Sequence, residues 1–530
     1  MTAVLNRSQC GTWAVIGTMA IAAAPVASQQ PLNGATTLAN LAEVDATAGS
    51  MSERTFLLTG LLAPAGVSTV IRPLTRRSRD SLFSWTGAEP GTKRLVVTSP
   101  VASIWLNSRR AAVDRDGAVW QGRGVTMAVS GGAVAEAGPL SASVRPLVAW
   151  SSNADYAPVR GPRPPDLREP FYGSRVDLPY RFGEGAYALA SPGESWISLN
   201  AWRLSAGGTS ASQAWGPAHY YPLVLGTEAA GYPRLFAEAR GLPLGLATMS
   251  ASWSLGRLES SPEIGRASGD RSRFASAMIV SLSPTGFRGL EAGVTRFFHG
   301  RLERGWLSMP TATLPFARLF KAKDAGEISS RSVNQLASVF ARLAPPGAGV
   351  EAYFEFLRED HNADVRDLFG EPDHASGYTV GFRRAWRAGE TVRAITLETT
   401  NGRISHLARV RVQQPLYVHD DITEGHTHLG QPLGSTAVLG GGAYAIAYDI
   451  VGAQHSRQVE AEVRRVAQNQ EGGLYSGYGS TVASIRVTEW RDRARLSIGA
   501  SVKLSATMGL IPGNSVTLML AARGGRSGQF

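Results

Sequence analysis

Apolar and polar residues alternate along several stretches of the chain, including residues 290–298, 350–356, 444–450 and 496–505. In the last stretch serine, glycine and lysine separate the apolar residues, which are Leu496, Ile498, Ala500, Val502 and Leu504. Successive residues of a β-strand point to opposite faces of the sheet. Each stretch therefore predicts a strand with one apolar face and one polar face.

The pattern of predicted strands favours a barrel that spans a membrane. After the first 28 residues, no segment has 18 or more consecutive apolar residues. A chain without apolar helices can cross a bilayer only as a closed barrel. Residues 97–530, at about 24 residues for a strand and its connection, give around 18 strands. We therefore predict an all-β fold, a transmembrane antiparallel β-barrel, although a soluble array of β-sandwiches would show similar alternation.

The N-terminus has the order of a secretory signal. Arg7 is the charged residue of the first ten, an apolar stretch follows at 11–24, and small residues close the segment at 25–28. This order predicts a signal peptide over residues 1–28. A buried helix and a membrane anchor are the alternatives, but spanning a bilayer takes roughly 20 apolar residues. The single cysteine, Cys10, lies within the signal, so the exported chain would have neither thiol nor disulfide.

The segment that follows differs from the rest of the chain. Leucines in residues 29–96 recur at helical spacing, for example at Leu57, Leu58, Leu61 and Leu62. We expect a small, partly helical segment in the periplasm, followed by the barrel over 97–530. The chain ends in an aromatic residue, Phe530, as outer-membrane barrels that are read by the barrel-insertion machinery commonly do. Aromatics near strand ends, Phe297, Trp386 and Trp490, are expected to form interfacial girdles.

Composition and charge limit the classes of partner that the protein is expected to bind. Hydrophobic residues make up 43% of the chain and charged residues 18%, and the net charge is +11. A charged fraction below the usual 25% or so suits a wall that faces lipid. The basic balance favours anionic polysaccharide or lipopolysaccharide beside the lipids of the outer membrane. Nucleic acid is not an expected partner, because the chain is exported and has no compact basic run with interleaved aromatics.

The densest group of polar side chains lies between residues 417 and 428. Its candidate polysaccharide-binding residues are Tyr417, His419, Asp420, His426 and His428. On a strand, two of these histidines would point the same way, as a paired metal site requires. A surface loop whose histidines bind sugar or water explains the same residues, so we predict neither a metal nor a cofactor.

Catalysis finds little support. Glu351 and Glu355 share one face of a predicted strand, but four strand residues separate them by about 13 Å. Glycosidases place their two carboxyls about 5 Å or about 6.5–9.5 Å apart. No serine, histidine and carboxylate arrangement stands out either, so we do not expect an enzyme.

Two groups of motifs resemble a known family. The first runs from Asp177-Leu-Pro-Tyr through Trp215-Gly-Pro to Ala230-Gly-Tyr-Pro, and the second starts at Tyr417-Val-His and ends at Gly430-Gln-Pro-Leu-Gly. This succession resembles the Wzi-like capsule-assembly family of outer-membrane proteins, over about residues 100–450. Tight turns and close backbone approach explain the motif residues as structural, namely Asp177, Trp215, Gly216, Pro217, Gly231, Pro233, Gly430 and Gly434.

The resemblance implies an 18-stranded barrel with a periplasmic helical segment. It also implies a lectin-like role in the outer membrane of a Gram-negative cell, where the barrel would hold capsular or extracellular polysaccharide at the surface and help capsule assembly. A diffusion channel, or porin, is the alternative function. An open lumen lined by polar residues would distinguish it from a plugged, lectin-like barrel.

Overall fold

A computed structural model describes most of the chain from residue 94 onward. The described residues are 61–62, 70–71, 94–109, 117–155, 176–179, 181–262, 272–302, 309–316, 333–359, 374–404, 414–419, 421–452, 455–466, 480–493, 496–508 and 513–524. The predicted signal peptide and Phe530 lie outside them. The division into signal, periplasmic segment and barrel therefore stays a prediction, with the first wall strand beginning at Arg94.

The wall consists of long strands in sequence order. The first half contains β1 (Arg94–Asn107), β2 (Gly124–Ala137), β3 (Leu140–Val144), β4 (Leu147–Ser151), β5 (Tyr187–Ser191), β6 (Trp196–Ala201), β7 (Leu204–Thr209), β8 (Arg234–Pro243), β9 (Ala247–Leu258), β10 (Arg273–Pro284) and β11 (Leu290–Arg301). The second half contains β12 (Val333–Leu343), β13 (Val350–Glu359), β14 (Ser376–Ala388), β15 (Thr391–Asn401), β18 (Gly442–Val451), β19 (His455–Val466), β20 (Ser480–Arg493), β21 (Leu496–Met508) and β22 (Gly513–Gly524).

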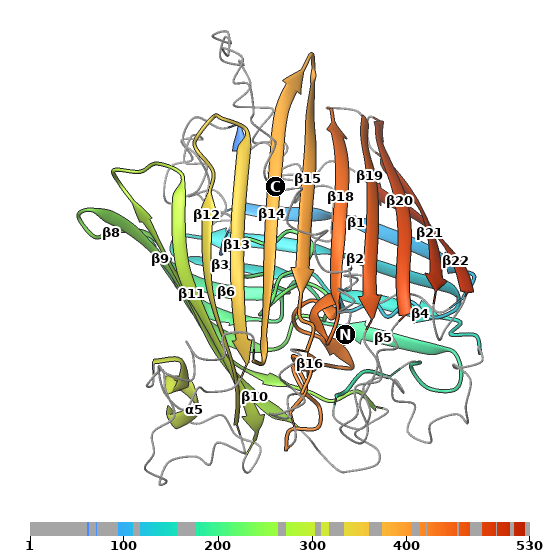
Figure 1. The fold of residues 1–530 in the computed structure, drawn as a ribbon, viewed down its shortest axis with the longest axis horizontal. Helices are drawn as coiled ribbons and strands as arrows, with labels where there is room; N and C mark the ends of the chain where they lie inside the picture. Colours follow the sequence, from blue (N-terminus) through green and yellow to red (C-terminus); the bar gives the residue numbers. More distant parts are fainter. Residues whose placement is uncertain are drawn as a thin grey trace, which may run out of the picture.

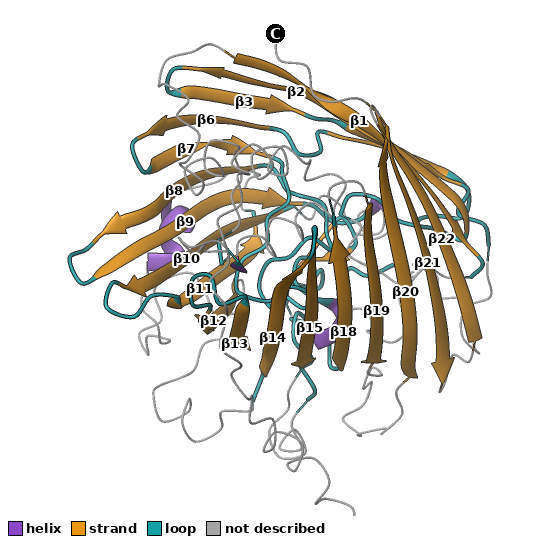
Figure 2. Cartoon of the chain, turned by 90° about the horizontal axis from the view of Figure 1, so that it is seen from above, coloured by secondary structure: helices purple, strands orange, loops and turns teal. Residues whose placement is uncertain are grey.

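The wall closes on itself, because β1 pairs with both β2 and β22 (Figures 1 and 2). All pairings between wall strands are antiparallel, and each strand pairs with its neighbours in the chain. β2 pairs with both β3 and β4, so these two segments form one interrupted strand, and β5 and β6 form the next. The described residues thus make a closed 18-stranded antiparallel barrel, and the predicted fold class is confirmed.

The two ends of the barrel differ in their connections. At one end, which is uppermost in Figure 1 for β14 and β15, the strands are joined by two to six residues, such as 138–139 and 344–349. At the other end most connections are long, such as 210–233 and 402–441. Short turns face the periplasm and long loops the exterior in outer-membrane barrels. We call these the short-turn end and the long-loop end.

The predicted alternation decides which face of each strand points outward. On β21, Ile498, Val502 and Leu504 are exposed on the outer wall, while Ser501 and Lys503 are buried on the inner side. The outer wall is apolar on every side. Its exposed residues include Val97, Ile104, Val129, Val148, Leu199, Leu235, Val339, Ile446, Ile485 and Leu520. This belt suits hydrocarbon, and the chain is an outer-membrane β-barrel.

The aromatic girdle is only partly as expected. Trp386 lies on the outer wall near the short-turn end, and its ring centroid is 6.4 Å from that of Tyr448. The prediction is wrong for Phe297 and Trp490, which are buried on the inner side of the wall. An aromatic residue near a strand end has the same sequence signature whether it faces lipid or fills the lumen.

Short elements complete the fold. Helix α5 (Met309–Thr313) and the 3-10 turn η3 (Leu314–Phe316) lie against the outer wall, where Trp253 Nε1 donates to Ala312 O at 3.0 Å. The strands β16 (Thr427–His428) and β17 (Gln431–Pro432) form a hairpin, and η5 (Thr436–Val438) follows it. In the described part of the chain, no helix is long and apolar enough to cross a membrane.

Candidate functional site in the barrel lumen

Two long connections fold into the barrel instead of standing above it. The first inner loop comprises residues 210–233, between β7 and β8. The second comprises residues 414–441, between β15 and β18, and is described except for Asp420. Both are largely buried, and Figure 2 shows loop segments across the space that the wall encloses. The lumen is therefore occupied by the chain itself.

An apolar core joins the inner loops to the wall. The loops contribute Trp215, Leu223, Val224, Leu225, Tyr232, Leu416, Tyr417, Leu433, Val438 and Leu439. The wall strands β10 to β13 contribute Ala275, Ala277, Ile279, Phe297, Leu336, Phe340 and Leu357. Burial of apolar side chains stabilises such a cluster by about 1.5–3 kcal/mol for each large one. The inner loops are thus packed against one side of the wall like an ordinary protein core.

Val70 and Ile71 reach the same core from the N-terminal segment. Ile71 forms an isolated antiparallel bridge with Trp215, and Gly216 N donates to Val70 O at 2.9 Å. Leu61 lies at the short-turn end, where its carbonyl accepts a hydrogen bond from Gly349 N at 3.2 Å. The described part of the N-terminal segment therefore lies along the inside of the barrel from that end.

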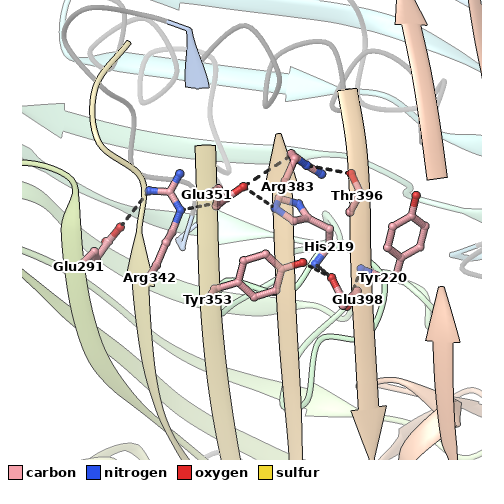
Figure 3. Close-up of polar contacts among 9 residues, drawn as sticks. All are labelled: His219, Tyr220, Glu291, Arg342, Glu351, Tyr353, Arg383, Thr396 and Glu398. Carbon is pink, nitrogen blue, oxygen red and sulfur yellow. Dashed lines mark hydrogen bonds and ion pairs between the residues drawn. The ribbon is translucent and has the colours of Figure 1, made fainter. Parts of the chain in front are cut away.

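A glutamate of the wall holds the first inner loop. The backbone N–H groups of His219, Tyr220 and Tyr221 all donate to the Glu398 carboxylate, at 2.8, 3.0 and 2.6 Å. Figure 3 draws Glu398 with the first two of these residues. The Tyr353 hydroxyl donates to the same carboxylate. Three consecutive N–H groups point one way because the chain turns sharply here, and no strand or helix partner satisfies them. Glu398 fills this anion site, so the loop is fixed to β15.

A second wall glutamate contacts the same loop through His219 and is surrounded by wall arginines. Glu351 Oε1 lies 2.5 Å from Arg342 Nε, and its Oε2 lies 3.1 Å from His219 Nε2 and 3.9 Å from Arg383 Nη1 (Figure 3). Arg342 also approaches Glu291 Oε2 at 3.9 Å. All of these side chains are nearly inaccessible, so the network is a set of mutually compensated buried charges.

Glutamate carboxylates follow one another along the inner face of β13, which faces the two inner loops. Glu351 and Glu355 do lie on one face, as the sequence predicts, and Glu359 follows at the same spacing. Ser338 Oγ donates to Glu355 Oε1 at 2.7 Å, and Tyr417 N donates to Glu359 Oε2 at 2.5 Å. Within the described residues, Glu355 Oε2 is buried without a hydrogen-bond partner, whereas the bonded oxygens named here are occupied by the protein. The arrangement of these carboxylates positions the inner loops.

The candidate polysaccharide-binding residues lie mostly beneath the surface of the second inner loop. The Tyr417 hydroxyl donates to Leu223 O at 2.6 Å, and His426 Nε2 donates to Val224 O at 2.7 Å. His428 Nδ1 accepts a hydrogen bond from Glu259 N at 3.0 Å. These three side chains are buried, and each fastens the loop to another segment. Their role in polysaccharide contact stays a prediction.

His419 lies closer to the long-loop end, where the Arg301 guanidinium at the end of β11 donates to Asp421 O at 3.1 Å. His419 is 9% exposed, and its Nδ1 accepts hydrogen bonds from the backbone N–H groups of Asp421 at 3.1 Å and Ile422 at 3.2 Å. Its neighbour Asp421 is exposed, and Asp420 lies outside the described residues. Around all these candidates, the described residues contain no group of three His, Cys, Asp or Glu side chains that could hold a metal ion.

The buried histidines are neutral near pH 7. Burial lowers the pKa of His426 to about 3, with a further lowering by the Arg273 guanidinium. Burial likewise lowers the pKa of His428 to about 3, helped by Arg273 and Arg234. A neutral imidazole suits a ring that bonds to a carbonyl or a peptide N–H group.

The motif residues occupy crowded positions. Asp177 accepts hydrogen bonds from the backbone N and the Oγ of Ser261, each at 2.6 Å, and burial raises the pKa of its carboxyl. Gly216 has φ +89°, and Gly430 has φ +77°. A Cβ at Gly231 would lie 2.2 Å from Ser210 O, and a Cβ at Gly434 would lie 2.3 Å from the Tyr417 hydroxyl. Trp215 and Pro217 are buried, whereas Pro233 is exposed.

Comparison with known proteins places this fold. No family model matches the sequence, and no curated protein matches it. Among solved structures, the chain is similar to Wzi of Escherichia coli, described as an outer-membrane protein involved in group 1 capsule assembly and a carbohydrate-binding β-barrel. The TM-score is 0.56 at 12% identity, covering 92% of this chain and 97% of Wzi. The fold is that of the Wzi barrel. For the fold, this confirms the resemblance that the motifs predict.

Two outer-membrane proteins of Pseudomonas aeruginosa match more loosely. OccK2 gives a TM-score of 0.41 at 9% identity, over 82% of this chain and 98% of its own. OprD gives 0.40 at 8% identity, over 82% of this chain and 94% of its own.

Proposed function

We propose that this Wzi-like barrel binds capsular or extracellular polysaccharide at the cell surface and helps to assemble the capsule there. The observation that carries the proposal is the occupied lumen. The inner loops pack an apolar core against β10 to β13, and buried carboxylates hold them in place. A barrel closed in this way suits a surface-binding role, and the similar fold of Wzi, a carbohydrate-binding barrel, supports the same choice.

The proposed contact surface is the long-loop end. In the observed conformation, His419 is the least buried of the described candidates, and Asp420, which follows it in the sequence, stays a predicted contact. Tyr417, His426 and His428 are buried, so their contact with sugar would require the second inner loop to open. The net charge of +11 favours an acidic glycan. Lipopolysaccharide and the barrel-insertion machinery remain predicted partners of the wall and the C-terminus.

A diffusion channel is the second candidate, and one observation favours it. The inner faces of β19, β20 and β21 carry polar side chains of the kind that line channels, and these are buried in the observed conformation. These residues are Gln458, Glu460, Thr488, Ser501 and Lys503. On this interpretation, the inner loops would fill one side of the barrel while small solutes pass along the other.

Glycan binding by the detergent-solubilised protein, at low and high salt, tests the proposal. We expect saturable binding to an acidic polysaccharide, weakened by salt. His419→Ala should reduce binding, whereas His455→Ala, at the short-turn end, should not. A strain that lacks the protein should release capsule into the medium.

Failure has two distinct forms. If no glycan binds and the reconstituted protein conducts ions, the channel replaces the lectin-like barrel. If polysaccharide binds equally well to the wild type and to His419→Ala, the function stands but the predicted contact residue is wrong.

A further inference from the structure

A row of cross-strand neighbours that includes two arginines crosses the outer wall close to the short-turn end. Trp386 on β14 lies opposite Arg393 on β15, and Arg393 lies opposite Ile450 on β18. Ile450 lies opposite Arg457 on β19, which lies opposite Glu489 on β20. These strands stand side by side in Figure 1. The row therefore continues across five adjacent strands.

Two more arginines extend this row. Arg384 lies two residues from Trp386 on the same face of β14, and Arg491 lies two residues from Glu489 on β20. We define the basic arc as Arg384, Arg393, Arg457 and Arg491. All four side chains are exposed.

The arc lies at the edge of the apolar belt. On the same outer face Ile395 lies opposite Arg384, and Leu397 on β15 and Val487 and Ile485 on β20 lie farther from the short turns, all exposed. The Trp386 and Tyr448 rings, 6.4 Å apart, lie at the level of the arc. Aromatic rings and long basic side chains at this height are typical of the membrane–water interface, where the charged head reaches the headgroups.

The arc has more positive than negative charge. Glu489 binds Arg457 at 2.8 Å and Arg491 at 2.7 Å, and His455 Nε2 approaches it at 3.2 Å. Within the described residues, no carboxylate forms an ion pair with Arg384 or Arg393. In the adjoining hairpin end, Arg387 and Glu390 add one charge of each sign. Four arginines therefore face one carboxylate on this part of the wall.

We propose that the basic arc binds the phosphate groups of anionic phospholipids in the periplasmic leaflet of the outer membrane. A planar guanidinium offers two parallel N–H donors to phosphate oxygens. Arg384 and Arg393, which pair with no carboxylate of the described residues, supply these donors, while Trp386 packs on the glycerol region and the belt takes the acyl chains. The surplus charge selects an anionic headgroup over a zwitterionic one.

Lipid retention by the purified, full-length mature protein tests this site. The protein is transferred into mixed micelles that contain phosphatidylglycerol or phosphatidylethanolamine, and bound lipid is counted by native mass spectrometry. We expect preferential retention of phosphatidylglycerol. Arg384→Gln with Arg393→Gln should lower that retention by roughly fivefold for each arginine. Arg384→Lys with Arg393→Lys should lose less, because the charge remains.

The control is Arg203→Gln with Arg288→Gln, two arginines in short turns outside the arc. This variant should retain phosphatidylglycerol as the wild type does. Equal retention of both lipids by the wild type would overturn the proposal. So would an equal loss in the control, which would mean that general charge attracts the lipid. Displacement of phosphatidylglycerol by lipopolysaccharide at the arc would also overturn it.

Discussion

Two glutamates of the wall have nearly the same partners and opposite surroundings. Glu351 on β13 and Glu489 on β20 are each approached by two arginines and one histidine. Glu351 faces the lumen, and its side chain is 1% exposed. Glu489 faces outward, and its side chain is 25% exposed. The same set of side chains therefore occurs once inside the barrel and once at the membrane boundary.

The two clusters differ in what can solvate the arginines and the histidine when the glutamate is removed. Around Glu489, water and lipid headgroups can solvate the released cations, so an exposed ion pair contributes little to stability. Around Glu351, neither is available, and a cation left alone would remain buried without compensation. The inner cluster therefore fixes the inner loops, while the outer cluster can be lost at little cost in stability.

Glu351→Ala should destabilise the barrel more than any other single substitution in this comparison. It leaves the guanidinium groups of Arg342 and Arg383 buried beside His219, which should cost about 3–5 kcal/mol of folding stability. The measurement is the unfolding midpoint of the purified barrel, with ion conductance as a second readout of plug release. Glu489→Ala is the matched control. An unchanged midpoint for Glu351→Ala would show that the plug does not depend on this cluster.

Gly434→Ala should have the next largest effect. The new methyl group would lie 2.3 Å from the Tyr417 hydroxyl and 2.6 Å from Leu223 O, so the two inner loops must separate. Such overpacking costs about 1–3 kcal/mol. Gly286→Ala is the control, because a Cβ at this turn residue meets no atom within 4 Å. The same midpoint assay applies, and equal values for the two variants would contradict tight packing between the loops.

Acidification should gradually lower the folding stability that the two inner loops contribute. His426 and His428 have folded pKa values of about 3, below the unfolded value of 6.5. Between these values the unfolded state takes up protons and the folded state does not, so stability falls as the pH falls. The slope approaches about 1.4 kcal/mol per pH unit for each histidine. Asp177, whose pKa burial raises, acts in the opposite direction toward the acidic end.

His428→Asn separates the contribution of one histidine. The asparagine Oδ1 can accept the hydrogen bond from Glu259 N but does not titrate, so the loss of stability between about pH 7 and about pH 5 should be smaller in the variant than in the wild type. Unfolding midpoints of the wild type and the variant at both pH values provide the measurement. A wild-type midpoint that rises on acidification would exclude this mechanism.

The wall was predictable from the sequence because the two faces of a strand are encoded locally. The alternation around Ile498 and Val502 depends only on neighbouring residues, and the structure places both on the outer face. The helical spacing near Leu61 likewise points to a segment that differs from the wall. The local sequence pattern could not show whether Phe297 faces lipid or the packed lumen, since both environments accept an aromatic side chain.

The lumen site was much less predictable. Glu398 holds a loop whose N–H groups lie 177 to 179 residues away in the sequence, and no local pattern encodes such a pairing. The four-residue spacing of Glu351, Glu355 and Glu359 was the available signal, since inward carboxylates need partners inside the barrel. The motif around Tyr417 and His426 pointed to a loop that lies in the lumen, but the sequence does not show that these side chains point into the core.

Glu489→Gln should have the smallest effect on folding stability. Unlike the arginine substitutions, it should increase the binding of phosphatidylglycerol. Its cations are exposed, so we expect no measurable change in the unfolding midpoint. Removing the one carboxylate of the basic arc releases Arg457 and Arg491 for phosphate, so retention of phosphatidylglycerol should rise. Native mass spectrometry of the variant in the same micelles measures this change. A fall in retention would mean that Glu489 orients the two arginines for lipid, and a fall in the midpoint would remove the contrast with Glu351.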